Sequence, residues 1–531
     1  MTKAEPGAGP AREIEVKLAV PPDALDRLAE APALVARALR PARRRRLVSV
    51  YFDTPDGRLH RRGVALRVRR IGRRRIQTLK GPSRGTGVAA DRVELEIPIA
   101  GDTPDLAAFE GSAARQLTGL VLPGELVPVF TTRIERTELA VGWPSPEQCE
   151  AVVLVALDRG RIEADGRHEE IGELELELER GSSLALAALV EELRPIAPLA
   201  FEPRDKASRG FALAFGEAPR ARRAGRFAPM AEETVADAFR RIGLACLGHA
   251  LANLAAAAVG RDPEGVHQLR VALRRMRSAL ALFRPALPEA DRERLNGELR
   301  WLLGELGPAR DRDVLAGELV AAIDGIDGLE AERAALRALL AEGRPALYAR
   351  VREALASRRA ADLWLDLAAW LELGRFREAA SEEARALLDG PLRPFAAERL
   401  ERRWRRVRKL GRRFDRLDAA GRHELRIALK KLRYGIEFLG SLWPEAEVRR
   451  LASGAAELQD RLGHLNDVAV AQGLAREVLA AAAGDARLAP AALALGAVIG
   501  WHARAARRLL REARERLDEL LEVEPFWREA P

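Results

Sequence analysis

The sequence predicts an α+β domain at the N-terminus, followed by an all-α domain of two duplicated helical bundles. Between residues 11 and 215, apolar and charged residues alternate with a period of two, which is typical of strands. From residue 232 onward, apolar residues recur at spacings of three and four, which is typical of amphipathic helices. Long segments of this second half also repeat at a fixed offset of 156 residues.

The alternation predicts eight strands in the first domain. They lie at residues 13–18, 47–53, 64–70, 75–80, 92–99, 129–141, 152–158 and 173–179. Helical spacing predicts helices at residues 22–39, 103–118 and 183–195. Residues 216–231 combine Gly, Pro, Ala and Arg without either period, so we expect a linker there between a domain at 11–215 and a domain at 232–525.

Composition excludes several classes of protein. The 531 residues are 48% apolar, which is enough for sizeable cores. Only Cys149 and Cys246 are present, which excludes a disulfide framework and a cysteine-based zinc site, so oxygen or histidine must hold any metal. The net charge of +9 comes from a mixed surface, and aromatic residues at 5% argue against base stacking on nucleic acid. Without a long apolar run or an apolar N-terminal stretch, we expect a cytoplasmic protein with no membrane partner.

The internal repeat covers two matched segments in one register. VHQLRVALRRMRSALALF at 266–283 matches RHELRIALKKLRYGIEFL at 422–439, and LGPARD at 306–311 matches LGHLND at 462–467. Shared leucine and arginine content would not align a histidine, two arginines and an aspartate at once. We therefore expect two similar bundles, in which Asp311 and Asp467 begin helices after LG turns. There they either cap these helices or orient a basic side chain of the neighbouring helix.

Charged residues in the first domain gather on single faces of strands. In EIEVKL, the side chains of Glu13, Glu15 and Lys17 share one face. A sheet with a solvated outer side would explain the alternation, but the other strands carry nearly pure carboxylate or nearly pure guanidinium, which repels itself without a counter-charge. A closed barrel would supply that counter-charge, with acidic strands holding divalent cations and basic strands holding a polyanion.

This arrangement of charge points to a class of chemistry. Clustered carboxylates without His or Cys favour Mg²⁺ or Mn²⁺ over zinc. Facing arginines and lysines imply a phosphate-rich ligand. The reaction that fits is metal-assisted hydrolysis of a phosphoanhydride, in which no Ser-His or Cys-His nucleophile is needed.

A series of motifs in the first domain carries a family resemblance. EIEVKL is followed by YFDTPDGRL (51–59), ALRVRR (65–70), QTLKGP (77–82), RVELEIP (92–98), ALDRGRI (156–162), ELELEL (173–178) and RDKASRGFAL (204–213). In content and order they resemble the CYTH superfamily, the triphosphate tunnel metalloenzymes, whose signature is ExExK. The resemblance implies an eight-stranded antiparallel β tunnel that binds triphosphate end-on.

The resemblance also implies roles for individual residues. Metal ligands would be Glu13 and Glu15, with a second pair among Glu173, Glu175 and Glu177. Phosphates would be held by Lys17, Arg67, Arg69, Lys80, Arg92, Arg136 and Lys206. The catalytic set would be Glu13, Glu15, Lys17, Lys80, Glu94, Glu96 and Asp158, the last three positioning metal, water or cations. Arg133 lies three residues from Arg136 and so faces the other way, and we prefer Arg136; a surface role stays open for each single arginine.

The helical half carries two basic stripes. His267, Arg270, Arg274 and Arg277 share one helix face, and His423, Arg426, Lys430 and Arg433 repeat it. Like charges on one stripe repel unless they meet carboxylates or an anion. Pairing with acids of the next helix is one explanation, but the preceding helices bring His249 and Asn253 in one copy and Arg405 and Lys409 in the other. More cations therefore arrive than acids.

These stripes carry a second resemblance. VHQLRVALRRMRS and RHELRIALKKLRY, with GPARDRDVL and GHLNDVAVA, resemble the CHAD domain over about residues 232–525. The resemblance implies a groove that binds inorganic polyphosphate through His249, His267, Arg270, Arg274, Arg277, Arg405, Lys409, His423, Arg426, Lys430, Lys431 and Arg433. Of the 88 basic residues only seven are lysine, and all except Lys3 lie on or beside proposed phosphate-binding elements, where a compact ammonium is useful.

The two resemblances together predict a divalent-metal-dependent inorganic triphosphatase, resembling bacterial CYTH-CHAD enzymes, that converts triphosphate to diphosphate and phosphate. Mg²⁺ or Mn²⁺ would be its cofactor, and polyphosphate binding would associate it with polyphosphate granules. A non-catalytic polyphosphate-binding scaffold is a second hypothesis, although the intact acids argue against it. A thiamine or nucleoside triphosphatase, or an adenylate cyclase, is a third, although no aromatic stripe stands ready to stack a base. Nucleic acid is a weaker alternative partner, since polyphosphate mimics its backbone.

Overall fold

The computed structural model describes residues 14–81, 94–111, 115, 119–121, 124–230, 232–482, 485 and 488–528. The chain divides into two compact units. The first holds the described part of residues 1–220 with the segments 247–252 and 358–375, and the second holds residues 221–246, 253–357 and the described part of 376–531. Residues 217–230 contain neither helix nor strand, and the domain boundaries at 215 and 232 stay a prediction.

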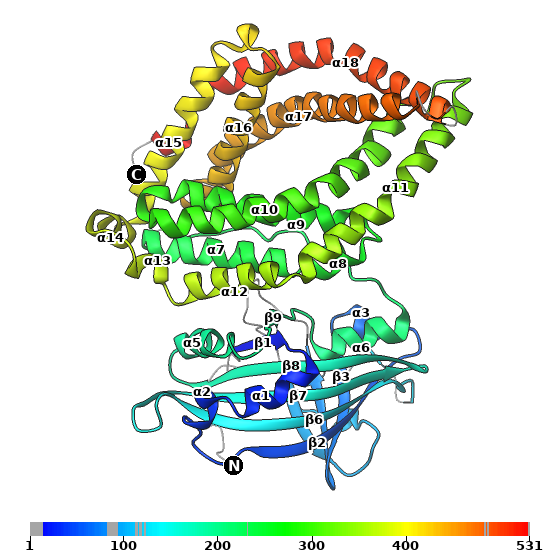
Figure 1. Cartoon of the computed structure of the whole chain (residues 1–531). Helices are drawn as coiled ribbons and strands as arrows, with labels where there is room; N and C mark the ends of the chain where they lie inside the picture. The colour runs from blue at the N-terminus through cyan, green and yellow to red at the C-terminus, as the bar shows by residue number, and fades with distance from the viewer. Residues whose placement is uncertain are drawn as a thin grey trace. The chain divides into compact units, whose positions relative to one another are not determined.

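The first unit is built on one antiparallel sheet with the strand order β5-β4-β3-β2-β6-β7-β8-β1-β9 (Figure 1). Its strands are β1 (Glu15–Ala19), β2 (Arg43–Asp53), β3 (Ala65–Ile71), β4 (Arg74–Lys80), β5 (Glu94–Ile99), β6 (Val127–Pro144), β7 (Cys149–Ala164), β8 (Arg167–Arg180) and β9 (Ala200–Phe201). The eight predicted strands are thus confirmed, and the two-residue β9 was missed. Strands β7 and β8 run beyond their predicted ends because Asp165 and Gly166, with φ of 47° and 74°, join them in a tight two-residue turn.

Short helices pack against both faces of the sheet, and the helix of Lys206–Phe215 lies on the charged face, where Lys206 contacts Glu173 of β8. They are η1 (Pro22–Ala24), α1 (Leu25–Ala29), α2 (Pro32–Val35), α3 (Arg58–Arg61), η2 (Leu106–Ala108), α5 (Leu184–Leu193) and α6 (Lys206–Phe215). The single helix predicted at 22–39 is therefore wrong, because Pro32 forces Ala31 into an extended conformation (ψ 128°) that ends α1. Leu174 and Leu176 of β8 form one core with Leu186 and Leu189 of α5. The charged residues of β8, which alternate with these leucines, face the opposite side.

The second unit consists almost entirely of helices. One helix of this part of the sequence, α12 (Arg358–Glu372), belongs to the first unit instead. The others are α7 (Val235–Leu251), α8 (Leu254–Val259), α9 (Pro263–Leu282), η3 (Arg284–Ala286), α10 (Glu289–Val314), η4 (Leu315–Leu319), η5 (Val320–Ile323), α11 (Glu330–Ala356), α13 (Arg375–Glu378), α14 (Glu382–Asp389), α15 (Leu392–Gly411), η6 (Phe414–Arg416), α16 (Ala419–Leu439), η7 (Gly440–Leu442), α17 (Glu445–Ala482), α18 (Ala489–Glu522) and η9 (Phe526–Arg528). Among the described residues, one stretch, Val235–Val259, is long and apolar enough to cross a membrane, and 56% of its most apolar window is buried within the protein.

The duplication of the helical unit is confirmed element by element. Asp262 and Asp418 are the N-caps of α9 and α16, and each accepts a hydrogen bond from a backbone N–H of the first turn. The short helices η3 and η7 follow at the same offset of 156 residues, as do the starts of α10 and α17. The two halves therefore have the same order of elements around α9 and α16.

The expectation that Asp311 and Asp467 begin helices is wrong. Both positions lie inside long helices, α10 and α17. Pro308 sits within α10 without ending it, because Leu306 and Ala309 on either side of it are buried in the core. Tertiary packing here outweighs the local preference for a turn.

Candidate active site

Three carboxylates of the sheet converge on one point. The register of β7 and β8 places Asp158 directly opposite Glu173, and Glu175 lies two residues farther along the same face of β8. One oxygen from each of Asp158, Glu173 and Glu175 lies within 4.8 Å of the others. An all-oxygen set of this kind suits a hard divalent cation. We call these three residues the carboxylate cluster.

Lys206 and Arg136 lie against the carboxylate cluster. Lys206 Nζ lies 2.9 Å from Asp158 Oδ2 and 2.8 Å from Glu175 Oε1, and it also contacts Glu173. Arg136 Nη2 lies 2.6 Å from oxygens of both Asp158 and Glu175. The N-cap Asp205 fixes the start of α6 and so positions Lys206, the first residue of that helix. The cluster thus binds positive charge even without an ion.

These contacts shift the pKa values of the cluster. Burial alone would raise the pKa of Glu175, but the charges of Lys206, Arg136 and Lys17 hold it well below its ordinary value. Burial raises the pKa of Glu173, although Lys206 opposes the rise. Burial would lower the pKa of Lys206, and the charges of the three carboxylates raise it overall. Glu175 and Lys206 are therefore both charged near neutral pH, and Glu173 takes up a proton more readily than an ordinary glutamate.

The ExExK strand brings further charges to this place. Lys17 of β1 lies opposite Glu175 of β8 in the register, and Glu15 lies opposite Glu177. Lys17 Nζ lies 2.8 Å from Glu15 Oε1 and 3.9 Å from Glu175 Oε1. Glu177 is half-buried on β8, and Glu13, a predicted metal ligand, lies outside the described residues.

A second group of charges lies on β3, β4 and β5. Lys80 Nζ lies 2.6 Å from Glu94 Oε2. Arg67 Nη2 lies more loosely, at 3.7 Å from Glu94 and 3.6 Å from Glu96. Thr78 Oγ1 donates to Glu96 Oε1 at 3.0 Å. The predicted phosphate ligand Arg92 lies outside the part of the chain that the structure describes.

Arg69 connects the two groups electrostatically. Burial lowers the pKa of Arg69 to about 10, and the positive charges of Arg67 and Arg136 lower it too. Within the described part of the chain, Arg69 Nε donates a hydrogen bond to Ser49 Oγ at 3.2 Å. Both groups of charges are largely shielded from solvent, since the side chain of Arg67 is 10% exposed and that of Lys206 is 9% exposed.

The structure separates Arg136 from Arg133 and adds residues that the sequence did not single out. Arg133 lies on the outer face, 54% exposed, and pairs with Glu163 at 2.9 Å. Arg209 of α6 lies 2.5 Å from Glu173 Oε1, and its spacing of three from Lys206 could have indicated it. Tyr51 accepts a hydrogen bond from Arg67 at 3.5 Å, and the register of β2 and β3 pairs the two residues. The roles of all these residues stay predictions.

The basic stripes of the helical unit fall into several environments. On α9, Arg270 donates to the carbonyl of Leu303 at 2.7 Å and Arg277 donates to Asn296 Oδ1 at 2.8 Å. Burial, together with the charge of Arg274, lowers the pKa of Arg270 to about 10. Among the other predicted residues, His249 is buried, His267, Arg426, Lys430 and Arg433 are half-buried, and Arg405, Lys409, His423 and Lys431 are exposed. Arg405 pairs with Glu401 at 3.0 Å. For this arginine, the alternative explanation holds, in which a carboxylate of the protein neutralises the cation.

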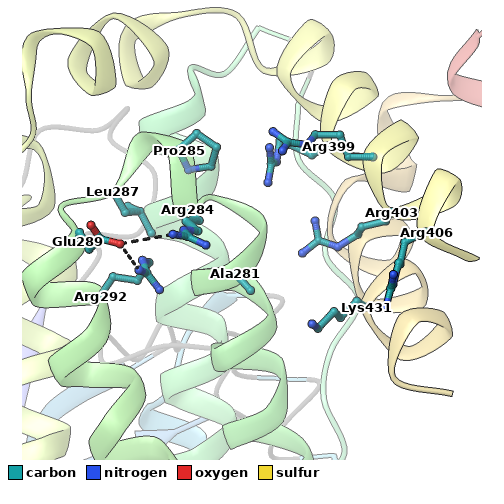
Figure 2. A pocket seen from close by; sticks show the side chains of 11 residues that line it. Ala281, Arg284, Pro285, Leu287, Glu289, Arg292, Arg399, Arg403, Arg406 and Lys431 are labelled. Carbon is teal, nitrogen blue, oxygen red and sulfur yellow. Dashed lines mark hydrogen bonds and ion pairs between the residues drawn. The ribbon is translucent and has the colours of Figure 1, made fainter. Parts of the chain in front are cut away.

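A basic pocket of about 630 Å³ opens in the helical unit (Figure 2). Its lining residues, which define what we call the α15 pocket, are Ala281, Arg284, Pro285, Leu287, Glu289, Arg292, Arg399, Arg402, Arg403, Arg406 and Lys431. Of these, the sequence prediction included Lys431. Four arginines on one side of α15 were the signal that could have found the pocket.

Comparison with known proteins identifies both halves. Residues 11–211 match the family model of the CYTH domain, and residues 241–476 match that of the CHAD domain. An inorganic triphosphatase of Haemophilus influenzae is 31% identical over 205 residues, which are 38% of this chain and 55% of that protein. This chain therefore matches about half the length of that relative.

Two solved structures are similar to parts of this chain. The CHAD domain of the plant Ricinus communis is 33% identical, with a TM-score of 0.48, and the match covers 56% of this chain and 96% of that one. PptA from Streptomyces chartreusis is 20% identical, with a TM-score of 0.39, over 55% of this chain and all of that one.

Proposed function

We propose that this chain, which belongs to the CYTH family over residues 11–211 and to the CHAD family over residues 241–476, is a divalent-metal-dependent inorganic triphosphatase whose helical domain binds polyphosphate. The observation that carries the proposal is the convergence of the carboxylate cluster with Arg136 and Lys206, with Arg69 close enough for the charge of Arg136 to lower its pKa. The activity named for the Haemophilus influenzae relative supports the choice of substrate.

The donor chemistry of the carboxylate cluster fits Mg²⁺ or Mn²⁺. Asp158, Glu173 and Glu175 offer oxygen alone, and their distances suit one shared cation. Lys206 now lies among these oxygens, so it would move toward a phosphate group when a metal binds. A bound metal would neutralise phosphate oxygens and orient the attacking water.

The basic strands would hold the substrate. Among the described contacts, Arg69 is hydrogen-bonded to Ser49 and has no carboxylate partner, so its guanidinium can turn to a phosphate. Arg67 is held at 3.6 Å or more by its acids, and Lys80 is held more closely by Glu94. With a pKa of about 10, Arg69 is charged at neutral pH. Enclosure strengthens each of these contacts with developing negative charge on the leaving diphosphate.

One carboxylate of the cluster is suited to accept a proton. The strongly lowered pKa of Glu175 makes it a poor base, whereas burial raises the pKa of Glu173 above its ordinary value. Glu173 Oε1 would therefore take the proton of the attacking water. Arg209, 2.5 Å from that oxygen, would hold the carboxylate in place.

Phosphate release from triphosphate tests the proposal. Purified full-length protein is given triphosphate with Mg²⁺, with Mn²⁺, or with a chelator, and Glu175→Gln is compared with Glu163→Gln. Glu163 is a matched control, because the same change of charge occurs on the outer face of the sheet, where it pairs with Arg133. We expect a fall of at least about 100-fold in Glu175→Gln and in chelator, and little change in the control.

Other outcomes would assign other functions. Faster release from ATP or thiamine triphosphate than from triphosphate would change the substrate, and no metal-dependent release from any of them would end the enzymatic proposal. A protein that binds polyphosphate without turnover would be a scaffold.

The polyphosphate part of the proposal has its own test. We propose that the basic stripes of α9 and α16 contact the polymer, and we expect Arg274→Gln with Lys430→Gln to weaken the binding of long-chain polyphosphate and to reduce its salt dependence. The double variant Arg358→Gln with Arg449→Gln, at two positions that are each 73% exposed, provides a control of equal charge change. Equal weakening in both proteins would contradict this assignment.

A further inference from the structure

A row of charged side chains crosses the sheet from the carboxylate cluster to β2. The register places Glu173 of β8 opposite Asp158 of β7, and Asp158 opposite Arg136 of β6. Arg136 in turn lies opposite Arg45 of β2. Residues directly opposite one another on neighbouring strands project to the same face of a sheet. Arg45 therefore extends the row that holds the carboxylate cluster.

Solvent exposure rises along this row. The side chain of Asp158 is fully buried, that of Arg136 is 17% exposed, and that of Arg45 is 39% exposed. Farther along the same face of β6, α6 covers the sheet, where Phe211 packs against Phe130 with the ring centroids 5.1 Å apart. Of the whole row, Arg45 is thus the cation most open to an incoming anion.

The charge around Arg45 is not balanced. Arg45 Nε lies 3.3 Å from Glu138 Oε2, and Arg43 lies directly opposite the same Glu138 in the register, so two arginines share one carboxylate. The three acids of the cluster are already matched by three cations in direct contact with them. Arg45 also lies opposite Arg136, and like charges directly opposite one another destabilise a sheet. An anion that contacts both arginines removes this cost.

The same two strands carry a matching ion pair on their outer face. Arg46 follows Arg45 in β2 and projects the other way, and Glu135 of β6 lies opposite it in the register. Arg46 Nε lies 3.1 Å from Glu135 Oε1, and the side chain of Arg46 is 86% exposed. The two pairs have the same chemistry and the same strands, but only the pair of Arg45 and Glu138 shares a face with the cluster.

The outer end of a phosphate chain decides what an arginine at this place gains. A terminal phosphate carries about −1.5 to −2 charges near neutral pH. A phosphate that is esterified to a nucleoside on its outer side has one ionisable oxygen fewer. A guanidinium group binds a phosphate through parallel hydrogen bonds to its oxygens. An arginine at the exposed end of the row therefore gains more from an inorganic chain than from an organic ester.

We propose that Arg45 is a specificity-determining residue, which binds the outermost phosphate of the substrate and so selects inorganic triphosphate over organic esters of triphosphate. Without substrate, Glu138 holds the guanidinium group of Arg45, and the phosphate displaces Glu138 when it binds. Arg43 then takes over this carboxylate, so that no charge is left unpaired. This inference rests on the proposed triphosphatase function and names the feature of the substrate that the site selects.

Steady-state kinetics of the full-length protein with Mg²⁺ tests the assignment, with triphosphate and ATP as the two probes. The affinity for ATP is measured as a KM or, where turnover is too slow, as the inhibition constant against triphosphate. We expect Arg45→Gln to raise the KM for triphosphate about tenfold or more and to change the value for ATP less than about threefold. The kcat for triphosphate should be largely kept, because the lost contact is made in the ground state and in the transition state alike.

Glu138→Gln should act in the opposite direction. Without this carboxylate, Arg45 meets the phosphate with no competitor, so the KM for triphosphate should fall about threefold. The gain should vanish in the double variant Arg45→Gln with Glu138→Gln. Arg46→Gln and Glu135→Gln make the same changes of charge on the outer face and should leave both affinities unchanged. Measurement at about 0.15 M salt screens the long-range effect of net charge.

Equal changes for triphosphate and ATP in Arg45→Gln would overturn the proposal, as would an equal effect of Arg46→Gln or a higher KM in Glu138→Gln. Thermal unfolding of each variant checks that the fold is kept. Absence of phosphate release from the wild-type protein would instead count against the triphosphatase proposal. Calorimetric titration of the same variants with triphosphate and ATP would then decide the role of Arg45 by the same criteria.

Discussion

Lys206→Gln tests how the buried charges of the carboxylate cluster are balanced. Asp158, Glu173 and Glu175 carry three negative charges, and Arg136, Arg209 and Lys206 supply three positive charges in direct contact with them. Lys17 lies 3.9 Å from Glu175, but it is paired more closely with Glu15, at 2.8 Å. The lysine side chain is 9% exposed, so its replacement leaves one buried negative charge uncompensated. Breaking a buried pair in this way costs about 3–5 kcal/mol.

Hydrogen exchange of the full-length protein measures this cost locally, through the opening free energy of the amides of β7 and β8. At pH 7.5 without divalent metal, we expect the opening free energy of these amides to fall in Lys206→Gln. We expect most of this free energy to be recovered when Mg²⁺ is added and takes the place of the Lys206 ammonium. The control is Arg133→Gln, which breaks the exposed ion pair with Glu163 on the outer face of the same sheet. This substitution should lower the opening free energy by about 0–1 kcal/mol.

The loss should also depend on pH. Burial raises the pKa of Glu173 and Lys206 opposes that rise, so the pKa rises further in the variant. A carboxyl group whose pKa is raised in the folded state favours folding at low pH and loses that contribution as pH rises through the folded pKa. The deficit of the variant should therefore shrink on acidification. A deficit equal to that of Arg133→Gln, or one that neither acid nor Mg²⁺ reduces, would refute this account.

Three further variants test other parts of the structure. Arg69→Gln should raise the KM for triphosphate about tenfold or more with little loss of stability, because Arg69 has no carboxylate partner among the described contacts; steady-state kinetics checks this, and an unchanged KM would contradict its role. Gly160→Ala should destabilise β6 and β7 by about 1–3 kcal/mol or more, measured by hydrogen exchange, since its Cβ would collide with the backbone carbonyl of Arg133, which cannot yield as a side chain could. Glu437→Ala should cost about 3–5 kcal/mol in thermal or denaturant unfolding of the helical unit by leaving Arg275 buried without its acid, and a neutral result would show that the Gly225 carbonyl and the Phe227 ring, which Arg275 also contacts, suffice.

Local patterns were reliable where one physical rule dominated. Period-two alternation located all eight predicted strands, because a strand with one apolar and one charged face has to alternate. The spacing of three between Arg133 and Arg136 placed them on opposite faces, as the structure has them. Pattern reading failed where packing outweighed local preference, as at Pro308 inside α10.

The candidate site was predicted unevenly. The acidic and basic faces were visible in the strands, but the choice of Asp158, Glu173 and Glu175 as the cluster required the register of β7 and β8, which alternation leaves open. Arg209 was missed because its partner Glu173 is 36 residues away in the sequence. The α15 pocket was missed because its walls come from helices more than a hundred residues apart.

The sequence by itself determined the types of elements, the duplication and the segregation of charge onto faces, since these depend on periodicity within one segment. Tertiary structure alone decided which acids meet, which cation lies among them, and that Arg45 lies opposite Arg136 in the row that begins at Glu173. The physical reason is that electrostatic interactions act through distance in space, and the distances between segments remote in sequence are set by strand register and helix packing.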